Sequence, residues 1–380
     1  MNPSEALALT SIKRVVVKVG SNVLTAEYGL NMETIFAISR QICSLMDKGL
    51  EVLLVTSGAM AAGVRKIGLP GRPDEIPKRQ AIAAVGQPGL MLAYDTAFGQ
   101  QGKKVAQILL TGEDLSNRKR YLNARNTFNA LLAWGVVPII NENDTVAVES
   151  IKFGDNDNLS AMITLLMDAD LLINLTDIDG LYTKDPRVFQ DARLVPIISS
   201  ISRDIEKWAG DIPGALGTGG MSSKIKAAKK VTAAGIPMII AKGNKPDVLI
   251  RLFNGETHGT YFAPKARRLA CRKCWIAFSI KPTGSITVDS GAARALLTNG
   301  KSLLPSGIVN VDGEFGEGAA VECKTEANEV LGIGLVNYSA ADIRLIKGLK
   351  TNQIKRLLGS KPYDEIIHRD NLAITAVQDA

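Results

Sequence analysis

RVVVKVG, residues 14–20, is followed along the chain by METIFAISRQICSLMDKG (32–49) and EVLLVTSGA (51–59). The first and last of these runs are mainly apolar and rich in β-branched residues, which is typical of strands buried on both faces of a sheet. The middle segment places its apolar residues three and four positions apart, which predicts a helix, and Gly49 marks its end. Strands of this kind separated by helices predict a parallel sheet with both faces covered.

Four further apolar runs extend the pattern to about residue 263: KVAQILL (104–110), VVPIINEND (136–144), DLLINLTD (170–177) and IPMIIAKG (236–243). We therefore expect an α/β fold whose open sheet is mainly parallel and has helices on both faces. Polar residues follow four of the six predicted strands, at Lys18–Gly20, Thr56–Gly58, Asn141–Asp144 and Thr176–Asp177. Because the ligand crevice of an open α/β sheet lies at the carboxyl ends of its strands, these residues predict a binding site.

The pattern changes after residue 282, where short β-type runs are broken by glycine, as in GSITVDSGAARALL (284–297). These runs predict a small, mainly β module. The sequence thus divides into an α/β domain over residues 1–263, a basic linker over residues 264–281, and the β module with a C-terminal tail over residues 282–380.

The net charge of +7 is concentrated in one short segment. Residues 264–281 carry six basic and no acidic residues, whereas residues 282–380 carry ten basic and twelve acidic residues. Binding of RNA or DNA usually needs a basic face, so this distribution argues against a nucleic-acid-binding module. Only the basic segment keeps an RNA-binding role open.

No run of 18 apolar residues predicts a membrane span, and the N-terminal sequence lacks the features of a signal peptide. Four cysteines in 380 residues are typical of a reducing compartment, so we expect a cytoplasmic protein. Cys271 and Cys274 have CxxC spacing, but no second pair completes a zinc site, and we predict no metal-ligating residues. The two histidines, His258 and His368, lie in no catalytic motif, which argues against a histidine-dependent nucleophile.

The segment FGDNDNLS (153–160) places two carboxylates and two amides within four positions, ahead of a strongly apolar run. An EF-hand loop starting at Asp155 would need an oxygen ligand at position 5, glycine at position 6 and glutamate at position 12. Leu159, Ser160 and Leu166 occupy these positions, so calcium binding of this kind is excluded. By itself the segment favours a solvated turn whose Asp or Asn side chains cap a helix.

The sequence contains no Walker loop and no GxGxxG motif, so a nucleotide would have to be bound in another way. GALGTGGMSSK (214–224) has four glycines ahead of a helical pattern. Glycines allow backbone N–H groups to approach an anion, and a helix N-terminus adds partial positive charge. The alternative is a flexible surface loop. Lys18 interrupts an apolar strand, either as an edge or snorkelling residue or as a group directed at a phosphate.

Six segments in one order resemble the amino acid kinase family: VVKVGSNVL, VTSGAMAAG, INENDTVA, GDNDNLSA, LTDIDGLYTKDP and GTGGMSSK. The resemblance covers residues 12–262, and the fold that it implies is the amino acid kinase fold. Ser223 stands where threonine often occurs in the family, a change that keeps the hydroxyl group. The segment GSITVDSGAARALLTNGKSLLPSGI (284–308) resembles a PUA domain.

The resemblance implies ATP-dependent phosphorylation of the γ-carboxylate of L-glutamate to L-glutamyl 5-phosphate, the first step of proline biosynthesis. A carboxylate is already ionised at pH 7, so this nucleophile needs no general base, which fits the scarcity of histidines. ATP is the implied co-substrate, together with Mg²⁺. The main catalytic task is then to position two anions and to stabilise the charge on the transferred group.

By resemblance, Lys18 and Lys224 flank the transferred phosphoryl group, and Asp157 orients the two lysines. The residues implied in substrate binding are Ser57, Asp144 and Asn156. A carboxylate among them can pair with the α-ammonium group of the substrate. The residues implied in nucleotide binding are Lys18, Thr176, Asp177, Thr218, Gly219, Gly220, Met221, Ser222, Ser223 and Lys224.

Two alternatives stay open on the sequence alone. One is another kinase of the same fold that acts on a different carboxylate or carbamate, such as aspartate or acetylglutamate. The other is an RNA-binding or RNA-modifying protein with a PUA domain. The resemblance also implies a homo-oligomer, either a dimer or a tetramer, and a partnership with glutamyl-phosphate reductase. We expect neither an RNA partner nor membrane association.

Overall fold

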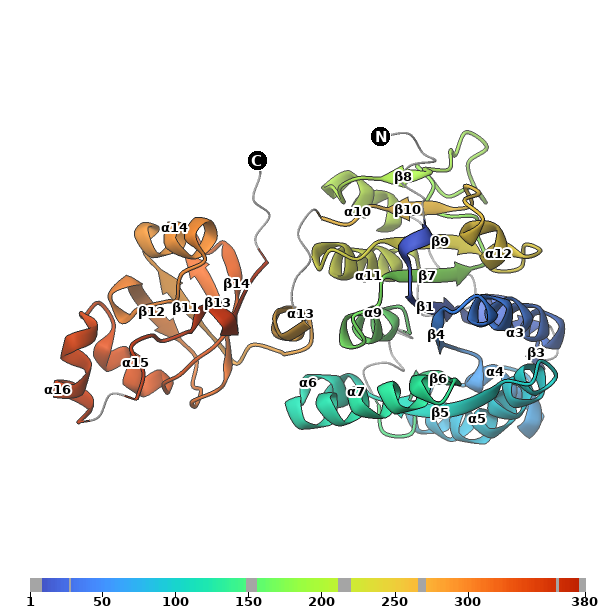
Figure 1. Ribbon diagram of the computed structural model, residues 1–380, viewed down its shortest axis with the longest axis horizontal. Coiled ribbons are helices and arrows are strands. Elements are labelled where there is room, and N and C mark those ends of the chain that lie inside the picture. The colour runs from blue at the N-terminus through green and yellow to red at the C-terminus, as the bar shows by residue number, and fades with distance from the viewer. Residues whose placement is uncertain are drawn as a thin grey trace. The chain divides into compact units, whose positions relative to one another are not determined.

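The computed structural model describes residues 9–26, 29–147, 156–210, 220–265, 271–359 and 362–375. The chain forms two compact units, Met1–Arg268 and Leu269–Ala380 (Figure 1). Each unit has its own sheet and its own hydrophobic core. Among the described residues, no helix combines the length and the apolar character that crossing a bilayer requires.

The first unit is built on an eight-stranded sheet with the order β5-β6-β4-β1-β7-β9-β10-β8. The six strands predicted from apolar runs are present, and all neighbouring pairs among them are parallel. They are β1 (Arg14–Val19), β4 (Glu51–Val55), β5 (Lys104–Leu110), β6 (Val136–Glu142), β7 (Leu171–Thr176) and β9 (Met238–Lys242). At one edge, β10 (Thr260–Phe262) pairs antiparallel with β9 and parallel with β8 (Ile197–Ile198).

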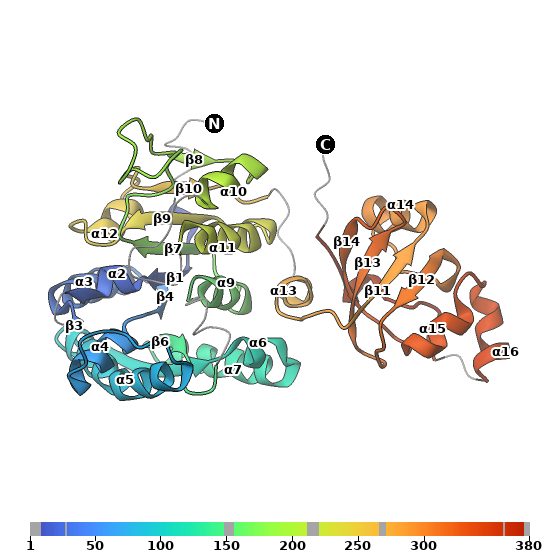
Figure 2. The ribbon, with the colours of Figure 1, turned by 180° about the vertical axis from the view of Figure 1, so that it is seen from behind.

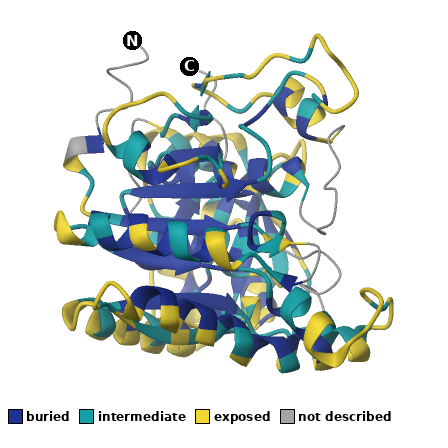
Figure 3. Ribbon diagram, turned by 90° about the vertical axis from the view of Figure 1, so that its right-hand side faces the viewer, coloured by how far each residue is buried: buried dark blue, intermediate teal, exposed yellow. Residues whose placement is uncertain are grey.

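Helices cover both faces of this sheet, as the sequence predicts (Figure 2). One face packs against α3 (Met32–Asp47), α5 (Ile76–Gly99) and α12 (Val248–Phe253). The other face packs against α9 (Asn156–Leu166) and α11 (Met221–Ala233), which contact each other. The central strands β1, β4, β6, β7 and β9 are largely buried between these two layers (Figure 3). The remaining elements of the unit are η1 (Leu9–Ser11), α2 (Ser21–Leu24), β2 (Thr25–Ala26), β3 (Gly29–Leu30), α4 (Ala59–Ile67), α6 (Gly112–Ser116), α7 (Arg118–Ala133) and α10 (Arg203–Gly210).

The helices α4 and α5 pack with their backbones in close contact because Gly86 has no side chain. A Cβ atom at this position would lie 1.8 Å from the carbonyl oxygen of Ala59, a distance that no real side chain can adopt. The turn between β4 and α4 contains Gly58, whose φ of 108° favours glycine. This packing fixes the position of Ser57 at the carboxyl end of β4.

The second unit contains a five-stranded sheet with the order β12-β11-β13-β14-β15. β11 and β13 are parallel, and the other neighbouring pairs are antiparallel. The strands are β11 (Gly284–Val288), β12 (Ile308–Asp312), β13 (Ala320–Thr325), β14 (Val330–Leu335) and β15 (Leu372–Ile374). The helices are α13 (Cys271–Phe278), α14 (Ser290–Asn299), η2 (Pro305–Gly307), α15 (Ala340–Ile346), η3 (Thr351–Gln353), α16 (Ile354–Leu358) and η4 (Arg369–Asn371). The sheet and its core fit the small, mainly β module that the sequence predicts.

The predicted basic linker, residues 264–281, includes a helix in the structure. Part of this segment forms α13, which packs against β14 and β15 of the second unit. The boundary between the two units falls between Arg268 and Leu269. The basic residues that suggested a linker stand beside an apolar stripe, Cys274–Ala277, which is buried. Burial of this stripe stabilises the helix in spite of its charged neighbours.

Candidate active site

The carboxylate of Asp157, in the first turn of α9, is the centre of a buried polar cluster. Its Oδ1 atom accepts hydrogen bonds from Lys18 Nζ at 2.5 Å and from Asn174 Nδ2 at 2.8 Å. Its Oδ2 atom accepts from Ser223 Oγ at 2.5 Å and from Lys224 Nζ at 3.1 Å. The exposed fractions of Asp157, Lys18 and Lys224 are only 1%, 5% and 6%. Both predicted catalytic lysines therefore lie against the carboxylate that was predicted to orient them.

The register of the sheet explains why these side chains meet. Lys18 of β1 is paired with Asn174 of β7, so the two side chains leave the same face of adjacent strands. The neighbours of Lys18, Val17 and Val19, point to the opposite face and enter the hydrophobic core there. The face that Lys18 shares with Asn174 is the one covered by α9 and α11, which carry the remaining residues of the cluster.

Electrostatics keep this cluster charged although it is buried. Burial by itself raises the pKa of the Asp157 carboxyl. The ammonium groups of Lys18 and Lys224, with the hydrogen bonds from Lys18 and Ser223, outweigh that effect and hold the pKa well below its usual range. Asp157 is thus a carboxylate at neutral pH. A phosphate group that enters beside it would meet two ammonium groups.

The contacts of Ser223 and Lys224 with Asp157 place the N-terminus of α11 beside the buried cluster. Ser223 Oγ lies 2.8 Å from the carbonyl oxygen of Gly220, the residue that precedes the helix. The first backbone N–H groups of a helix have no partner within it and form an anion-binding site. Met221 is buried and Ser222 is exposed, so a contribution of Met221 to phosphate binding would come from its backbone N–H. Of the predicted nucleotide-binding residues, two lie outside the described residues, namely Thr218 and Gly219.

Thr176 and Asp177 follow at the carboxyl end of β7. Asp177 Oδ1 accepts a hydrogen bond from Thr176 Oγ1 at 3.0 Å, and its Oδ2 accepts one from Asn22 Nδ2 at 2.8 Å. Burial raises the pKa of Asp177, but these hydrogen bonds and the charge of Lys224 hold it below its usual value. Asn22, in α2, is a contact that the sequence analysis did not identify.

Asn156, the neighbour of Asp157, faces a different set of groups. Its Nδ2 donates to the carbonyl oxygen of Thr56 at 2.8 Å and to Ser57 Oγ at 2.9 Å, and lies 3.1 Å from Asn141 Oδ1. Its Oδ1 is buried and has no hydrogen-bond partner among the described residues. Asn156 and Ser57, two of the predicted substrate-binding residues, are therefore in direct contact.

Asp144, the third predicted substrate-binding residue, lies in the turn after β6 and is half-buried. Burial raises the pKa of its carboxyl to about 6, and the nearby charge of Arg72 opposes this rise. The structure gives Asp144 no hydrogen bond to any other described residue, and the hydrogen bonds of Asn156 go to Thr56, Ser57 and Asn141. A carboxylate in this state gains stability when a cation binds to it.

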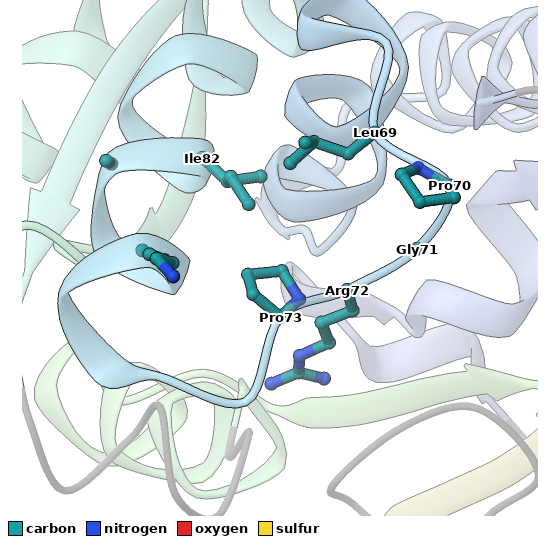
Figure 4. Close-up of a pocket in the computed structure, with 8 residues that line it drawn as sticks. Leu69, Pro70, Gly71, Arg72, Pro73 and Ile82 are labelled. Carbon is teal, nitrogen blue, oxygen red and sulfur yellow. The ribbon is translucent and has the colours of Figure 1, made fainter.

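A pocket of about 720 Å³ lies between α4 and the start of α5, and Figure 4 shows its lining. It is lined by Leu69, Pro70, Gly71, Arg72, Pro73, Lys78, Ala81 and Ile82. None of the predicted catalytic, substrate-binding or nucleotide-binding residues is in this lining. Only Arg72, through its charge, acts on a predicted site residue, Asp144. The pocket is therefore separate from the Asp157 cluster.

Three residues of the site escaped the sequence analysis: Asn174, Asn22 and Gln87. Gln87, in α5, accepts a hydrogen bond from Asn141 at 2.9 Å. Asn174 could have been found, because it is a polar residue within a continuously apolar strand whose two faces are both buried. Asn22 lies in the segment VVKVGSNVL, but nothing in that segment predicts its contact with Asp177. Gln87 stands in none of the quoted motifs, and its contact with Asn141 arises from tertiary packing.

Comparison with known proteins agrees with both resemblances. The sequence pattern of the amino acid kinase family matches residues 13–242, and that of the PUA domain matches residues 284–358. The chain is 51% identical to the glutamate 5-kinase of Syntrophus aciditrophicus (strain SB), over 98% of this chain and 97% of that protein. It is also 51% identical to the glutamate 5-kinase of Meiothermus ruber, over 96% of each chain. The glutamate 5-kinase of Caldanaerobacter subterraneus subsp. tengcongensis is 51% identical as well, over 95% of this chain and 97% of that protein.

Proposed function

The chain belongs to the glutamate 5-kinases of the amino acid kinase family, and we propose that the Asp157 cluster and the groups around Asn156 are the two halves of its active site. The enzyme transfers the γ-phosphoryl group of ATP to the γ-carboxylate of L-glutamate and forms L-glutamyl 5-phosphate. This reaction is the first step of proline biosynthesis. A PUA domain follows the kinase domain in the same chain.

In the proposed mechanism the protein supplies positive charge and position rather than a base. The attacking γ-carboxylate is ionised at neutral pH, and its oxygen displaces ADP from the γ-phosphorus without a proton transfer. Lys18 and Lys224 neutralise charge on the transferred group as the bond to ADP breaks. Asp157 holds both ammonium groups in place, since each donates to one of its oxygens. The two lysines are thus held by different oxygens of one carboxylate.

The phosphates of ATP are proposed to bind at the N-terminus of α11, where Gly220, Met221, Ser222 and Ser223 present backbone N–H groups. Thr176 and Asp177 would contact the nucleotide at the end of β7. Thr218 and Gly219 belong to the same proposal on sequence grounds alone. The support for this placement is that Lys224 lies in the first turn of α11 and faces the Asp157 cluster.

Glutamate is proposed to bind at Ser57, Asn156 and Asp144. Ser57 Oγ accepts from Asn156 in the present arrangement, so its own O–H is available to donate to a carboxylate of glutamate. Asp144 would pair with the α-ammonium group, which relieves the cost of a half-buried carboxylate with a raised pKa. Ser57 lies at the carboxyl end of β4, and Asn156 lies at the start of α9, next to Asp157.

Mg²⁺ is proposed to arrive with ATP rather than to occupy a site made by the protein. The described residues contain no group of three His, Cys, Asp or Glu side chains that could hold a metal ion. Mg²⁺ keeps several waters and is commonly bound through the phosphates of its nucleotide. When bound in that way it would neutralise phosphate charge, and the roles of Lys18, Lys224 and Asp157 are the same with or without a protein ligand to the ion.

The single observation that supports this site most strongly is the burial of Lys18 and Lys224 on the two oxygens of Asp157. The test is phosphorylation of glutamate, aspartate and acetylglutamate with ATP and Mg²⁺, with hydroxylamine to trap the acyl phosphate. We expect hydroxamate only with glutamate. Lys224→Ala should lower kcat by roughly 10²–10³-fold. Lys226→Ala, at an exposed position on the same helix, should keep normal activity. Near-normal kcat in Lys224→Ala would contradict the proposed site.

We also propose that the enzyme is a cytoplasmic homo-oligomer, a dimer or a tetramer, that works together with glutamyl-phosphate reductase. An acyl phosphate hydrolyses readily in water, so rapid transfer to the next enzyme would conserve the product. Light scattering behind size exclusion measures the oligomeric state directly. With a nicotinamide hydride donor in place of hydroxylamine, added reductase should increase the yield of the reduced aldehyde product per ATP consumed.

A further inference from the structure

Three side-chain amides form a buried chain beneath the proposed glutamate site. Gln87 comes from α5, Asn141 from the end of β6, and Asn156 from the start of α9. Asn141 Nδ2 donates to Gln87 Oε1 at 2.9 Å, and Asn156 Nδ2 lies 3.1 Å from Asn141 Oδ1. Gln87 and Asn141 are only 8% and 3% exposed. Segments far apart in the sequence thus meet through one line of hydrogen bonds.

Each amide in this chain has a defined orientation. Asn141 Oδ1 also accepts from the backbone N–H of Glu142 at 2.9 Å, so this oxygen cannot exchange places with its nitrogen. The nitrogen of Asn141 must then face Gln87, which meets it with an oxygen. Asn156 in turn directs its nitrogen at three acceptors. A flipped amide would bring its oxygen against those acceptors, so the oxygen of Asn156 must point the other way.

This orientation leaves Asn156 with one unused capability, which is to accept a hydrogen bond. Its Oδ1 is buried and has no partner among the described residues. Ionised glutamate has two carboxylates, which only accept hydrogen bonds, and one α-ammonium group, which only donates them. The α-ammonium group is therefore the part of glutamate that satisfies this oxygen. A buried acceptor without a donor is costly, so binding of that group gains free energy.

We propose that Gln87 is a positioning residue for substrate recognition. Acting through Asn141, it holds the amide of Asn156 with the oxygen directed at the α-ammonium group of glutamate. Without the acceptor at Gln87, the nitrogen of Asn141 would be buried without a partner. Asn141 would then shift or rotate to satisfy it and would release the nitrogen of Asn156. The inference rests on the proposed assignment of Asn156 to the glutamate side of the active site.

The choice of variants follows from the two ends of the Gln87 amide. Its Oε1 accepts a hydrogen bond from Asn141, whereas its Nε2 is buried and has no partner among the described residues. Gln87→Met keeps the side-chain volume and removes the acceptor, and Gln87→Glu keeps an acceptor for Asn141. Gln41 offers a matched control, because it is also a buried glutamine whose oxygen accepts a hydrogen bond, from the backbone N–H of Leu249 at 2.9 Å. It lies on α3, outside the proposed site.

The test compares glutamate with glutarate, which has the same two carboxylates but no ammonium group. The measurements are the KM for glutamate, the Ki of glutarate as a competitor, the KM for ATP, and kcat. We expect Gln87→Met to raise the KM for glutamate about 10-fold, the scale of one weakened hydrogen bond to a charged group. The Ki of glutarate, the KM for ATP and kcat should each change less than about 3-fold, within the spread of an uncoupled substitution. Gln87→Glu should restore most of the affinity for glutamate.

Gln41→Met should lower the melting temperature and leave the ratio of the glutamate KM to the glutarate Ki unchanged. The inference is overturned if Gln87→Met weakens both ligands equally or neither, or if Gln41→Met changes the ratio. Should Gln87→Met fail to fold, Gln87→Asn withdraws the acceptor by one methylene and is judged by the same ratio. Wild-type protein that forms no glutamate-dependent ADP would instead refute the proposed function.

Discussion

Replacement of Asp157 by asparagine tests the central electrostatic contact of the proposed site. The substitution keeps the size of the side chain and removes its negative charge. In the folded protein this carboxylate receives both lysine ammonium groups, together with hydrogen bonds from Asn174 and Ser223. Asparagine leaves Lys18 and Lys224 buried without the anion between them, and its NH₂ group would face donors instead of accepting from them.

The cost can be estimated from the burial of the three charged groups, which are at most 6% exposed. Removing one partner of a buried ion pair destabilises a protein by about 3–5 kcal/mol, because the other charge stays buried without compensation. For a domain of this size, 1 kcal/mol corresponds to a shift in melting temperature of about 2 °C. We therefore expect Asp157→Asn to melt about 6–10 °C below the wild type at neutral pH. Its kcat should fall by roughly 10²–10³-fold, since both lysines lose their orientation.

The pH dependence of this loss has a definite sign. The folded state holds the pKa of Asp157 well below its unfolded value, which is near 4. A depressed carboxyl pKa contributes stability that is fully present above the unfolded value and is lost as the pH falls through the folded one. The stability difference between the wild type and Asp157→Asn should accordingly be constant between about pH 6 and 8. It should shrink below about pH 4, where the wild type begins to lose its advantage.

Urea unfolding at about pH 3.5 and at pH 5, 6, 7 and 8 measures this difference, and Asp185→Asn provides the control. Asp185 is also buried and accepts hydrogen bonds from Arg187, but the side chain of Arg187 is 39% exposed. Its cation can be hydrated when the carboxylate is removed, so a smaller loss is expected. A free energy of unfolding within about 1 kcal/mol of wild type for Asp157→Asn at pH 7 would refute the argument.

Asp144→Asn should raise the KM for glutamate roughly 10- to 100-fold, since a hydrogen bond to a charged group contributes about 1.5–3 kcal/mol. The KM for ATP should stay nearly unchanged, and loss of ATP binding instead would place Asp144 on the nucleotide side. Because burial raises the pKa of Asp144 to about 6, kcat/KM for glutamate should fall as the pH decreases below that value. Arg72→Met removes a charge that lowers this pKa, so the acid limb of the profile should move to higher pH, and an unmoved limb would contradict the coupling. A chain that ends at Arg268 should fold and phosphorylate glutamate. A chain that ends at Lys281 carries α13 without β14 and β15 and should aggregate, as measured by light scattering. An inactive but monodisperse chain ending at Arg268 would show that both units are needed for catalysis.

The long strands of the first unit could be predicted because each is a continuous apolar run. β8 and β10 could not, because two and three residues are too few to form a pattern, and their positions depend on pairing at the edge of the sheet. Helix α5 was also not predicted. It contains Gly86 and Pro88, which ordinarily interrupt a helix. In the folded protein Gly86 is required for contact with α4, a reason that the local sequence does not contain.

The candidate site likewise contains residues that sequence motifs predict and residues that only tertiary packing brings together. Lys18, Asp157 and Lys224 stand in motifs, and the register of β1 against β7 brings Asn174 to them. Gln87 stands in no motif that carries chemistry. It lies 54 positions before Asn141, and their hydrogen bond exists only because the tertiary fold brings α5 to the end of β6. A residue whose role is to orient another residue has no sequence signature of its own.

The geometry of the first turn of α9 explains why FGDNDNLS carries adjacent polar residues with different contacts. Asn156 and Asp157 are the first two residues of α9, and successive side chains of a helix point about 100° apart. Asn156 therefore faces Ser57 at the carboxyl end of β4, and Asp157 faces Lys18 and Lys224. In the proposed mechanism the first of these directions holds glutamate and the second holds the transferred phosphoryl group. The first turn of α9 would then set the distance between the two reactants, so that a single helix aligns an attack that needs no catalytic base.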